Sequence, residues 1–199
     1  MTGVLRYGRI LWLAVGLLLG TVIGGLWPYT PLHAIATDRS ESIIIATGLV
    51  DESVEAIFFL DSLTGTLRAA VPSLQRMTEY QAMWEANASA DLVACVRTVN
   101  GNVARLSGGK GAAAARPAIQ MPQAPRFLMV TGLMDIRQGS SRMRPSRSVV
   151  YVAEANTGIV MTYLLPWSVQ MHTSNQPLRM PMTLWAADQF PTAVIRAQE

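Results

Sequence analysis

The chain has 199 residues, of which half are apolar and 15% are charged, with a formal net charge of +3. This composition is too apolar and too poor in charge for an intrinsically disordered protein. The single cysteine excludes an intramolecular disulfide framework and any multi-cysteine zinc or iron–sulfur site. The two histidines, His33 and His172, leave little for a histidine-based metal site. We therefore expect no metal site and no cofactor.

An uncharged apolar run of 18 residues, 10–27, follows Arg6 and Arg9 near the N-terminus. At about 1.5 Å of rise per residue, a helix of this length reaches roughly 27 Å, close to the ~30 Å of a bilayer core. No basic residue follows until Arg39, so the positive-inside rule places the N-terminus in the cytoplasm. The predicted organisation is a cytoplasmic stretch over 1–9, a transmembrane anchor over 10–27, a linker over 28–41 and an exported domain over 42–199.

The same segment permits a second interpretation, a cleaved secretory signal peptide. Ala34-Ile35-Ala36 fits the A-x-A cleavage pattern, and cleavage after Ala36 would leave a secreted chain that starts at Thr37. The apolar run is longer than the roughly 7–15 residues of a signal-peptide core, which favours a retained signal-anchor. Both interpretations place the following domain outside the cytoplasm.

Two stretches of the exported part are similar in sequence. IIIATGLVD at 43–51 matches FLMVTGLMD at 127–135, and IFFLDSLTGTL at 57–67 matches VYVAEANTGIV at 150–160. In each case a short apolar run is followed by a second run that contains an acidic residue and a Thr-Gly pair, which is typical of strands joined by a hairpin turn. The sequence therefore predicts a duplicated strand–hairpin unit, over residues 43–71 and 127–165.

The second element of each unit contains the candidate site residues. Glycine accepts a positive φ, and acidic and threonine side chains accept hydrogen bonds from the backbone amides of a turn. The predicted structural turn residues are Asp61, Thr64, Gly65, Glu154, Thr157 and Gly158. The other interpretation makes Asp61 or Glu154 a ligand-binding or catalytic carboxylate.

The L-D-x-x-T-G-x-L pattern of 60–67 resembles the outer hairpins of β-propeller blades in quinoproteins, most clearly in VYVAEANTGIVMTY at 150–163. A propeller has roughly 4–8 four-stranded blades, so two units are too few for one chain and would need oligomerisation. Over most of residues 37–167 the chain resembles a group of short planctomycete proteins with an N-terminal hydrophobic segment. That resemblance implies an envelope-associated protein and identifies no active site.

Between the two units we expect one amphipathic helix over 73–90, with Ser73 as its N-cap and an apolar stripe at 74, 77, 80 and 84. A strand over 91–99, an Asn100-Gly101 turn and a returning strand over 103–106 are predicted to follow. Residues 107–126, rich in Gly, Ala and Pro, are predicted to form a flexible loop. The expected fold is mainly β, a β-rich α+β domain.

Charge is unevenly distributed along the exported part. Residues 38–91 contain nine acidic and three basic side chains, whereas residues 97–147 contain nine basic and one acidic. The basic segment suits an anionic partner, and the opposite charges suit packing or self-association. The basic loops lack interleaved aromatic residues, so we do not expect nucleic acid. The expected partners are the membrane, a second copy of the chain or another envelope protein.

Few residues indicate catalysis. Cys95 lies in the apolar run 92–96, which predicts a buried and inert thiol in a strand. We assign no catalytic, cofactor-binding or metal residues, and expect an interaction or structural protein of the bacterial envelope. The alternative is an exported ligand-binding or catalytic β-domain with a site near the Asp51 and Asp135 turns.

Overall fold

The computed structural model describes residues 12, 14–21, 37–40, 42–76, 78–107, 118–134, 136 and 143–190. The chain divides into two units, Met1–Ala34 and Ile35–Glu199. In the first unit, residues 14–21 are helical. Among the described residues, no helix combines the length and the apolar character needed to cross a membrane. The anchor predicted over 10–27 and the linker predicted over 28–41 lie mostly outside these residues.

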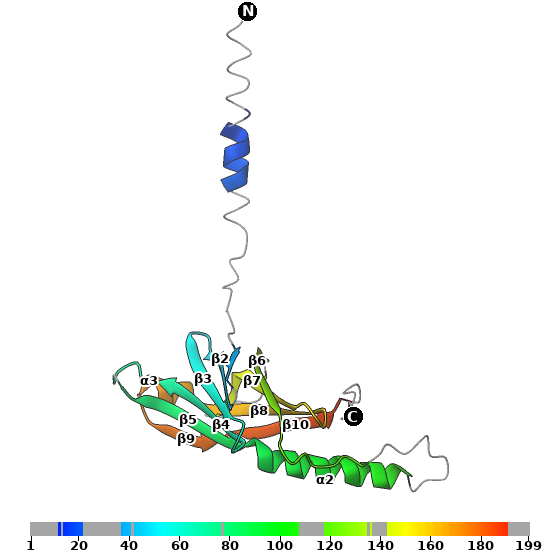
Figure 1. Ribbon diagram of the computed structural model, residues 1–199. Helices are drawn as coiled ribbons and strands as arrows, with labels where there is room; N and C mark the ends of the chain where they lie inside the picture. Colours follow the sequence, from blue (N-terminus) through cyan, green and yellow to red (C-terminus); the bar gives the residue numbers. More distant parts are fainter. Residues whose placement is uncertain are drawn as a thin grey trace, which may run out of the picture. The chain divides into compact units, whose positions relative to one another are not determined.

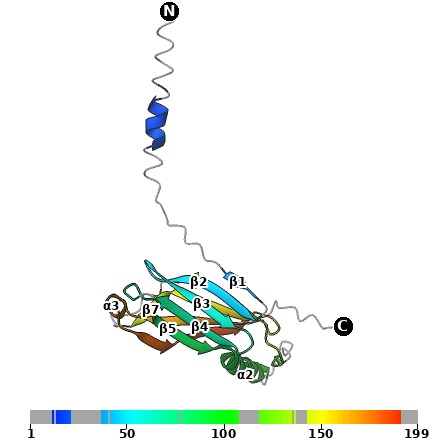
Figure 2. The ribbon, with the colours of Figure 1, turned by 60° about the vertical axis from the view of Figure 1, so that its left-hand side comes forward.

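The second unit is built mainly from β-strands, which confirms the predicted β-rich class (Figures 1 and 2). Sheet A has the order β1–β2–β3–β4–β5–β9, and sheet B has the order β10–β8–β7–β6. The strands of sheet A are β1 (Thr37–Arg39), β2 (Ile43–Asp51), β3 (Val54–Asp61), β4 (Thr66–Pro72), β5 (Tyr80–Asn87) and β9 (Leu178–Pro181). The strands of sheet B are β6 (Phe127–Leu133), β7 (Arg144–Glu154), β8 (Ile159–Trp167) and β10 (Thr183–Gln189). Two helices accompany them, α2 (Ala88–Ser107) and α3 (Val169–Thr173).

One hydrophobic core takes side chains from both sheets and from α2. Side chains of a strand alternate between its two faces; β2 shows this alternation in its burial, and β8 shows it except at 163–165, where three successive residues are buried. The largest fully buried side chains are Trp84, Trp167, Tyr163, Phe58 and Phe127. Because they come from β3, β5, β6 and β8, the core joins the two sheets into one packed domain.

Each of the two similar sequence stretches forms a three-stranded antiparallel meander, β2–β3–β4 in sheet A and β6–β7–β8 in sheet B. The two meanders present the shared motif to the core with opposite faces. Phe58 is buried, whereas Tyr151 at the matching position is partly exposed. Side chains of a strand alternate between its two faces, so a motif that turns its other face to the core exposes every residue that its copy buries.

The sheets meet along the outer edge of β2. β1 pairs with β2 over residues 44–46 and then ends. Beyond that point the carbonyl oxygens of Thr47 and Leu49 accept hydrogen bonds from the hydroxyls of Thr131 and Ser148 in sheet B. An added Cβ on Gly48 would lie 2.8 Å from the Ser148 Oγ and 3.3 Å from the Thr131 Cβ. The missing side chain of Gly48 therefore allows this contact.

At the other side of the domain, one short segment passes from sheet A to sheet B. β9 pairs with β5 in parallel, and β10 pairs with β8 two residues later. Met182, between β9 and β10, is buried, and its N–H donates to the carbonyl of Glu85. The crossing thus connects the two sheets covalently and through a backbone hydrogen bond.

The helix predicted over 73–90 is wrong. Residues 80–87 form β5, which pairs with β4 in register and buries Gln81, Ala82 and Trp84. The spacing of Tyr80 and Trp84 fits a helix as well as a strand, and the available edge of β4 selects the strand. Propensity is a weak guide where tertiary pairing opposes it.

The strands predicted over 91–99 and 103–106 are also wrong, because both ranges lie in α2. Ala88, Leu92, Cys95 and Val96 are buried at helical spacing. Asn100 makes no hairpin turn; its amide exchanges hydrogen bonds with the backbone of Ile119. Of the loop predicted over 107–126, residues 108–117 lie outside the described residues, and residues 118–126 have no helix or strand.

The contact at Gly48 generates a stability prediction. Gly48→Ala is expected to lower the free energy of unfolding by about 1–3 kcal/mol, because the added methyl group overpacks the contact between the sheets. Gly101→Ala is the matched control: it lies in α2 with open space around it and is expected to raise stability by about 0.5–1 kcal/mol. Urea unfolding followed by tryptophan fluorescence measures both. Unchanged stability in Gly48→Ala would contradict the tight contact.

Candidate functional site

The turn residues predicted in the first strand–hairpin unit, 43–71, lie at the turn between β3 and β4. The Asp61 carboxylate accepts hydrogen bonds from the N–H of Leu63 and from the N–H and hydroxyl of Thr64. These bonds, with that of the Thr64 hydroxyl the strongest influence, lower the pKa of the exposed Asp61 below its ordinary value. Gly65 has a φ of +69°, which glycine adopts without strain. Asp61, Thr64 and Gly65 thus lie together in one turn, in which Asp61 is partly exposed, Thr64 is exposed and Gly65 is buried.

The matching residues of the second strand–hairpin unit, 127–165, lie at the turn between β7 and β8. There the acidic side chain is fully buried. The Glu154 carboxylate accepts hydrogen bonds from the N–H groups of Arg126, Asn156 and Thr157, and from the side-chain amide of Asn156. Gly158 has a φ of +71°. The donors come from the turn itself and from Arg126, the residue before β6. The Glu154 carboxylate therefore holds the turn together.

The six predicted residues therefore form two turns in different sheets, and the structure does not bring them into one site. Both turns use the same bonds: the carboxylate accepts from the amides that follow it, and the Thr64 and Thr157 hydroxyls accept from the N–H two residues later. The exposure differs, because Asp61 and Thr64 are at least partly exposed while Glu154 and Thr157 are buried. The Thr64 hydroxyl donates to Asp61, whereas Glu154 accepts instead from the Arg126 N–H and the Asn156 side chain.

A polar and aromatic cluster surrounds Asp51, which the sequence offered only as an alternative site, and the other members of the cluster were not expected there. The Asp51 carboxylate accepts a hydrogen bond from the Trp167 indole N–H at 3.0 Å and lies 3.4 Å from the Arg144 guanidinium. Burial alone would raise the pKa of Asp51, but the bonds from Trp167, from the Glu52 N–H and from Arg144 together lower it. Asp135, which was expected near Asp51, lies outside the described residues.

His172 in α3 extends this cluster. Its ring lies 5.0 Å from the Trp167 ring, centroid to centroid, and its Nδ1 contacts Gln81 Oε1. The Gln81 side-chain nitrogen donates to the carbonyl oxygens of residues 171, 172 and 176, so Oε1 accepts and Nδ1 carries the proton. Burial lowers the pKa of His172, and the nearby Asp51 opposes this in part. The neutral imidazole thus helps to dock α3 on β5.

Sequence patterns give little sign of this cluster, because its members are distant in the chain. Asp51 and Trp167 are 116 residues apart, and Gln81 and His172 are 91 apart. A polar Gln81 in an apolar strand is the one available signal.

Cys95 is buried as expected, although it lies in α2 and not in a strand. Burial raises the pKa of the Cys95 thiol, and the neighbouring Asp91 raises it further. Asp91 accepts a hydrogen bond from the Tyr163 hydroxyl at 2.9 Å. Burial likewise raises the pKa of Tyr163. Both groups therefore stay protonated at neutral pH, which is the opposite of what a nucleophile requires.

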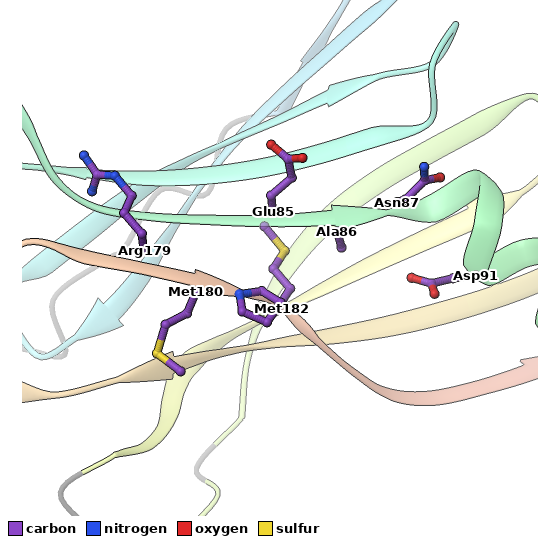
Figure 3. A pocket seen from close by; sticks show the side chains of 8 residues that line it. Glu85, Ala86, Asn87, Asp91, Arg179, Met180 and Met182 are labelled. Atoms are coloured by element: carbon purple, nitrogen blue, oxygen red, sulfur yellow. The ribbon is translucent and has the colours of Figure 1, made fainter.

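An open hollow of about 610 Å³ lies where the chain passes from β9 to β10 (Figure 3). Its polar lining is already engaged: Glu85 pairs with Arg68 at 2.8 Å, and the Arg179 guanidinium donates to the carbonyls of Tyr80 and Gln81. Ala86, Met180, Pro181 and Met182 supply the apolar part of the lining. The hollow has the volume for a small apolar molecule but offers it few free hydrogen-bonding groups.

Comparisons of this chain with protein-family models, with curated proteins and with solved structures gave no match.

The buried turn predicts a large difference between two equivalent substitutions. Glu154→Gln is expected to lower the free energy of unfolding by about 2–3 kcal/mol, because the amide nitrogen would face N–H donors that now bind a carboxylate. Asp61→Asn, the same change in the exposed copy of the turn, is expected to have a much smaller effect. Chemical denaturation measures both, and equal losses would contradict the different burial of the two turns.

His172 predicts a specific dependence of stability on pH. Its pKa is lower in the folded state than the ordinary 6.5, so below about pH 6.5 the unfolded chain binds a proton more readily than the folded chain. The free energy of unfolding is therefore expected to fall as the pH drops from 7.5 to 5.5. His172→Asn is expected to show a smaller fall, with His33 common to both proteins. An equal fall in the two proteins would show that His172 titrates as in the unfolded chain.

Proposed function

We propose that this chain is a membrane-anchored, extracytoplasmic interaction protein of the bacterial envelope, without catalytic activity. The observation that carries the proposal is the outward face of sheet B. Leu128 and Val130 on β6 are about half exposed, at 48% and 51%. Contiguous exposed apolar surface on a folded domain marks a contact site for another molecule.

The engagement of the described polar groups supports an interaction role over catalysis. Asp51, Asp61, Asp91 and Glu154 each accept hydrogen bonds that hold strands, turns or α2 in place. Cys95 and Tyr163 have raised pKa values, which disfavour the reactive anion. The chemistry of these residues is that of a scaffold.

The anchor and the duplication belong to the same proposal. The uncharged run 10–27 behind Arg6 and Arg9 would hold the domain on the outer side of the membrane. The two meanders β2–β4 and β6–β8 are proposed to descend from one strand–hairpin unit, since the Thr-Gly turns occupy the same place in both. The resemblance to short planctomycete envelope proteins agrees with this location.

A topology experiment tests the location. Alkaline phosphatase fused to the C-terminus is expected to be active and membrane-bound, because the enzyme folds only outside the cytoplasm. The control Leu18→Arg puts a charge in the apolar run, at a cost of about 2.5–3.5 kcal/mol, and is expected to reduce export. Intact mass is expected to include residues 1–36. A phosphatase-negative fusion would contradict export, and a mass starting at Thr37 would show secretion in place of anchoring.

A further inference from the structure

The outward face of sheet B has two adjacent uncharged rows of partly exposed side chains; in the row beyond them Val149 and Leu164 are buried. Strand register places Leu128, Ala153 and Val160 in one row across β6, β7 and β8, and Val130, Tyr151 and Thr162 in the next. Each side chain of these rows is at least partly exposed. We call these six residues, with Ala186 at the β10 end of the second row, the sheet B face.

Two opposite charges lie at the two edges of this face, near the same end of the strands. Asp188 on β10 ends the row that begins with Leu128. Arg126 immediately precedes β6, and by the alternation of the strand it falls on the same face as Leu128. Both side chains are exposed, and one Asp188 oxygen already accepts from the Gln189 N–H. The face is therefore apolar in its middle and oppositely charged at two corners.

From this arrangement we propose that the sheet B face binds the sheet B face of a second copy of the chain. Sheets stack face to face at about 10 Å with their strands nearly aligned. A twofold axis between them and parallel to the strands puts β6 of each copy over β10 of the other. Arg126 of each copy then faces Asp188 of the other, which gives two equivalent ion pairs.

The positions of the charges select this axis. A twofold axis across the strands would put β6 over β6 with its ends exchanged, and Arg126 would then lie far from Asp188. Arg147, exposed at the other end of β7, comes to lie over β8 of the copy, where the partly exposed Pro166 is uncharged. In this dimer the apolar rows supply buried area, while the corner pairs fix the orientation of the two copies.

This inference rests on the proposed interaction function and names its partner. The topology experiment above does not depend on it. A monomeric chain that is still exported would overturn the dimer alone, and a dimeric chain found in the cytoplasm would overturn the proposed location alone.

Charge exchange tests the dimer on the full-length chain in detergent micelles. Arg126→Glu would place a second carboxylate against Asp188, and Asp188→Arg would place a second guanidinium against Arg126. Each single variant is expected to weaken self-association by about tenfold or more. A mixture of the two variants restores both attractive pairs, and is expected to associate as tightly as the original chain. Sedimentation gives the mass, and energy transfer between C-terminal labels detects the mixed dimer.

The mixing step also controls for folding, because a misfolded variant would not regain self-association on mixing.

A matched pair of variants tests the apolar rows. Val130→Lys is expected to abolish the dimer, whereas Ile57→Lys, on the outer face of sheet A and 37% exposed, is expected to leave it intact. Association that survives Val130→Lys would overturn the proposal, since it would then arise elsewhere in the chain.

A photo-crosslinking amino acid at position 130, expressed in cells, tests the occupant directly. Adducts of twice the chain's mass are expected. Adducts with lipid, or with a different protein, would overturn the assignment to a second copy. A full-length chain that stays monomeric in sedimentation at roughly 100 micromolar would overturn it as well.

Discussion

The backbone of sheet A meets sheet B most closely at the outer edge of β2, where the hydroxyls of sheet B reach its carbonyl oxygens. Thr47 and Leu49 turn their carbonyls to an edge that β1 no longer covers, and Thr131 and Ser148 supply the donors. An uncovered strand edge is a site for unwanted pairing, so this contact satisfies the edge and joins the layers at the same time. It requires the backbone approach that Gly48 permits, and the packed core takes side chains from the same two sheets.

A comparison of the turns at Asp61 and Glu154 distinguishes the features set by local sequence from those set by the tertiary environment. In both turns the carboxylate accepts from the amides that follow it and a glycine has a positive φ, yet Asp61 is partly exposed and Glu154 is fully buried. The turn is specified by its own few residues, whereas the face it presents is set by the register of the strand that precedes it. A buried carboxylate is acceptable at Glu154 because four donors reach it, three of them backbone N–H groups.

Sequence alone was sufficient where structure is local and insufficient where it is not. The β-rich class follows from short apolar runs separated by turn residues. The assignments over 73–107 failed because Tyr80 and Trp84 suit a helix or a strand, and because Asn100-Gly101 is a turn signal that α2 tolerates. The cluster of Asp51, Trp167 and His172 was missed since its members meet only after both sheets have formed. Periodicity describes one segment at a time and carries no information about contacts between residues that are distant in sequence.

The crossing between β9 and β10 gives the domain a definite mechanical character. A pull on the C-terminal end of β10 acts along the strand, so it loads the hydrogen bonds to β8 in shear, all at once. Through Met182 the same force passes to β9 and on to β5 in the other layer. A load on the C-terminal end of β10 therefore reaches an edge strand of each sheet through one continuous stretch of backbone.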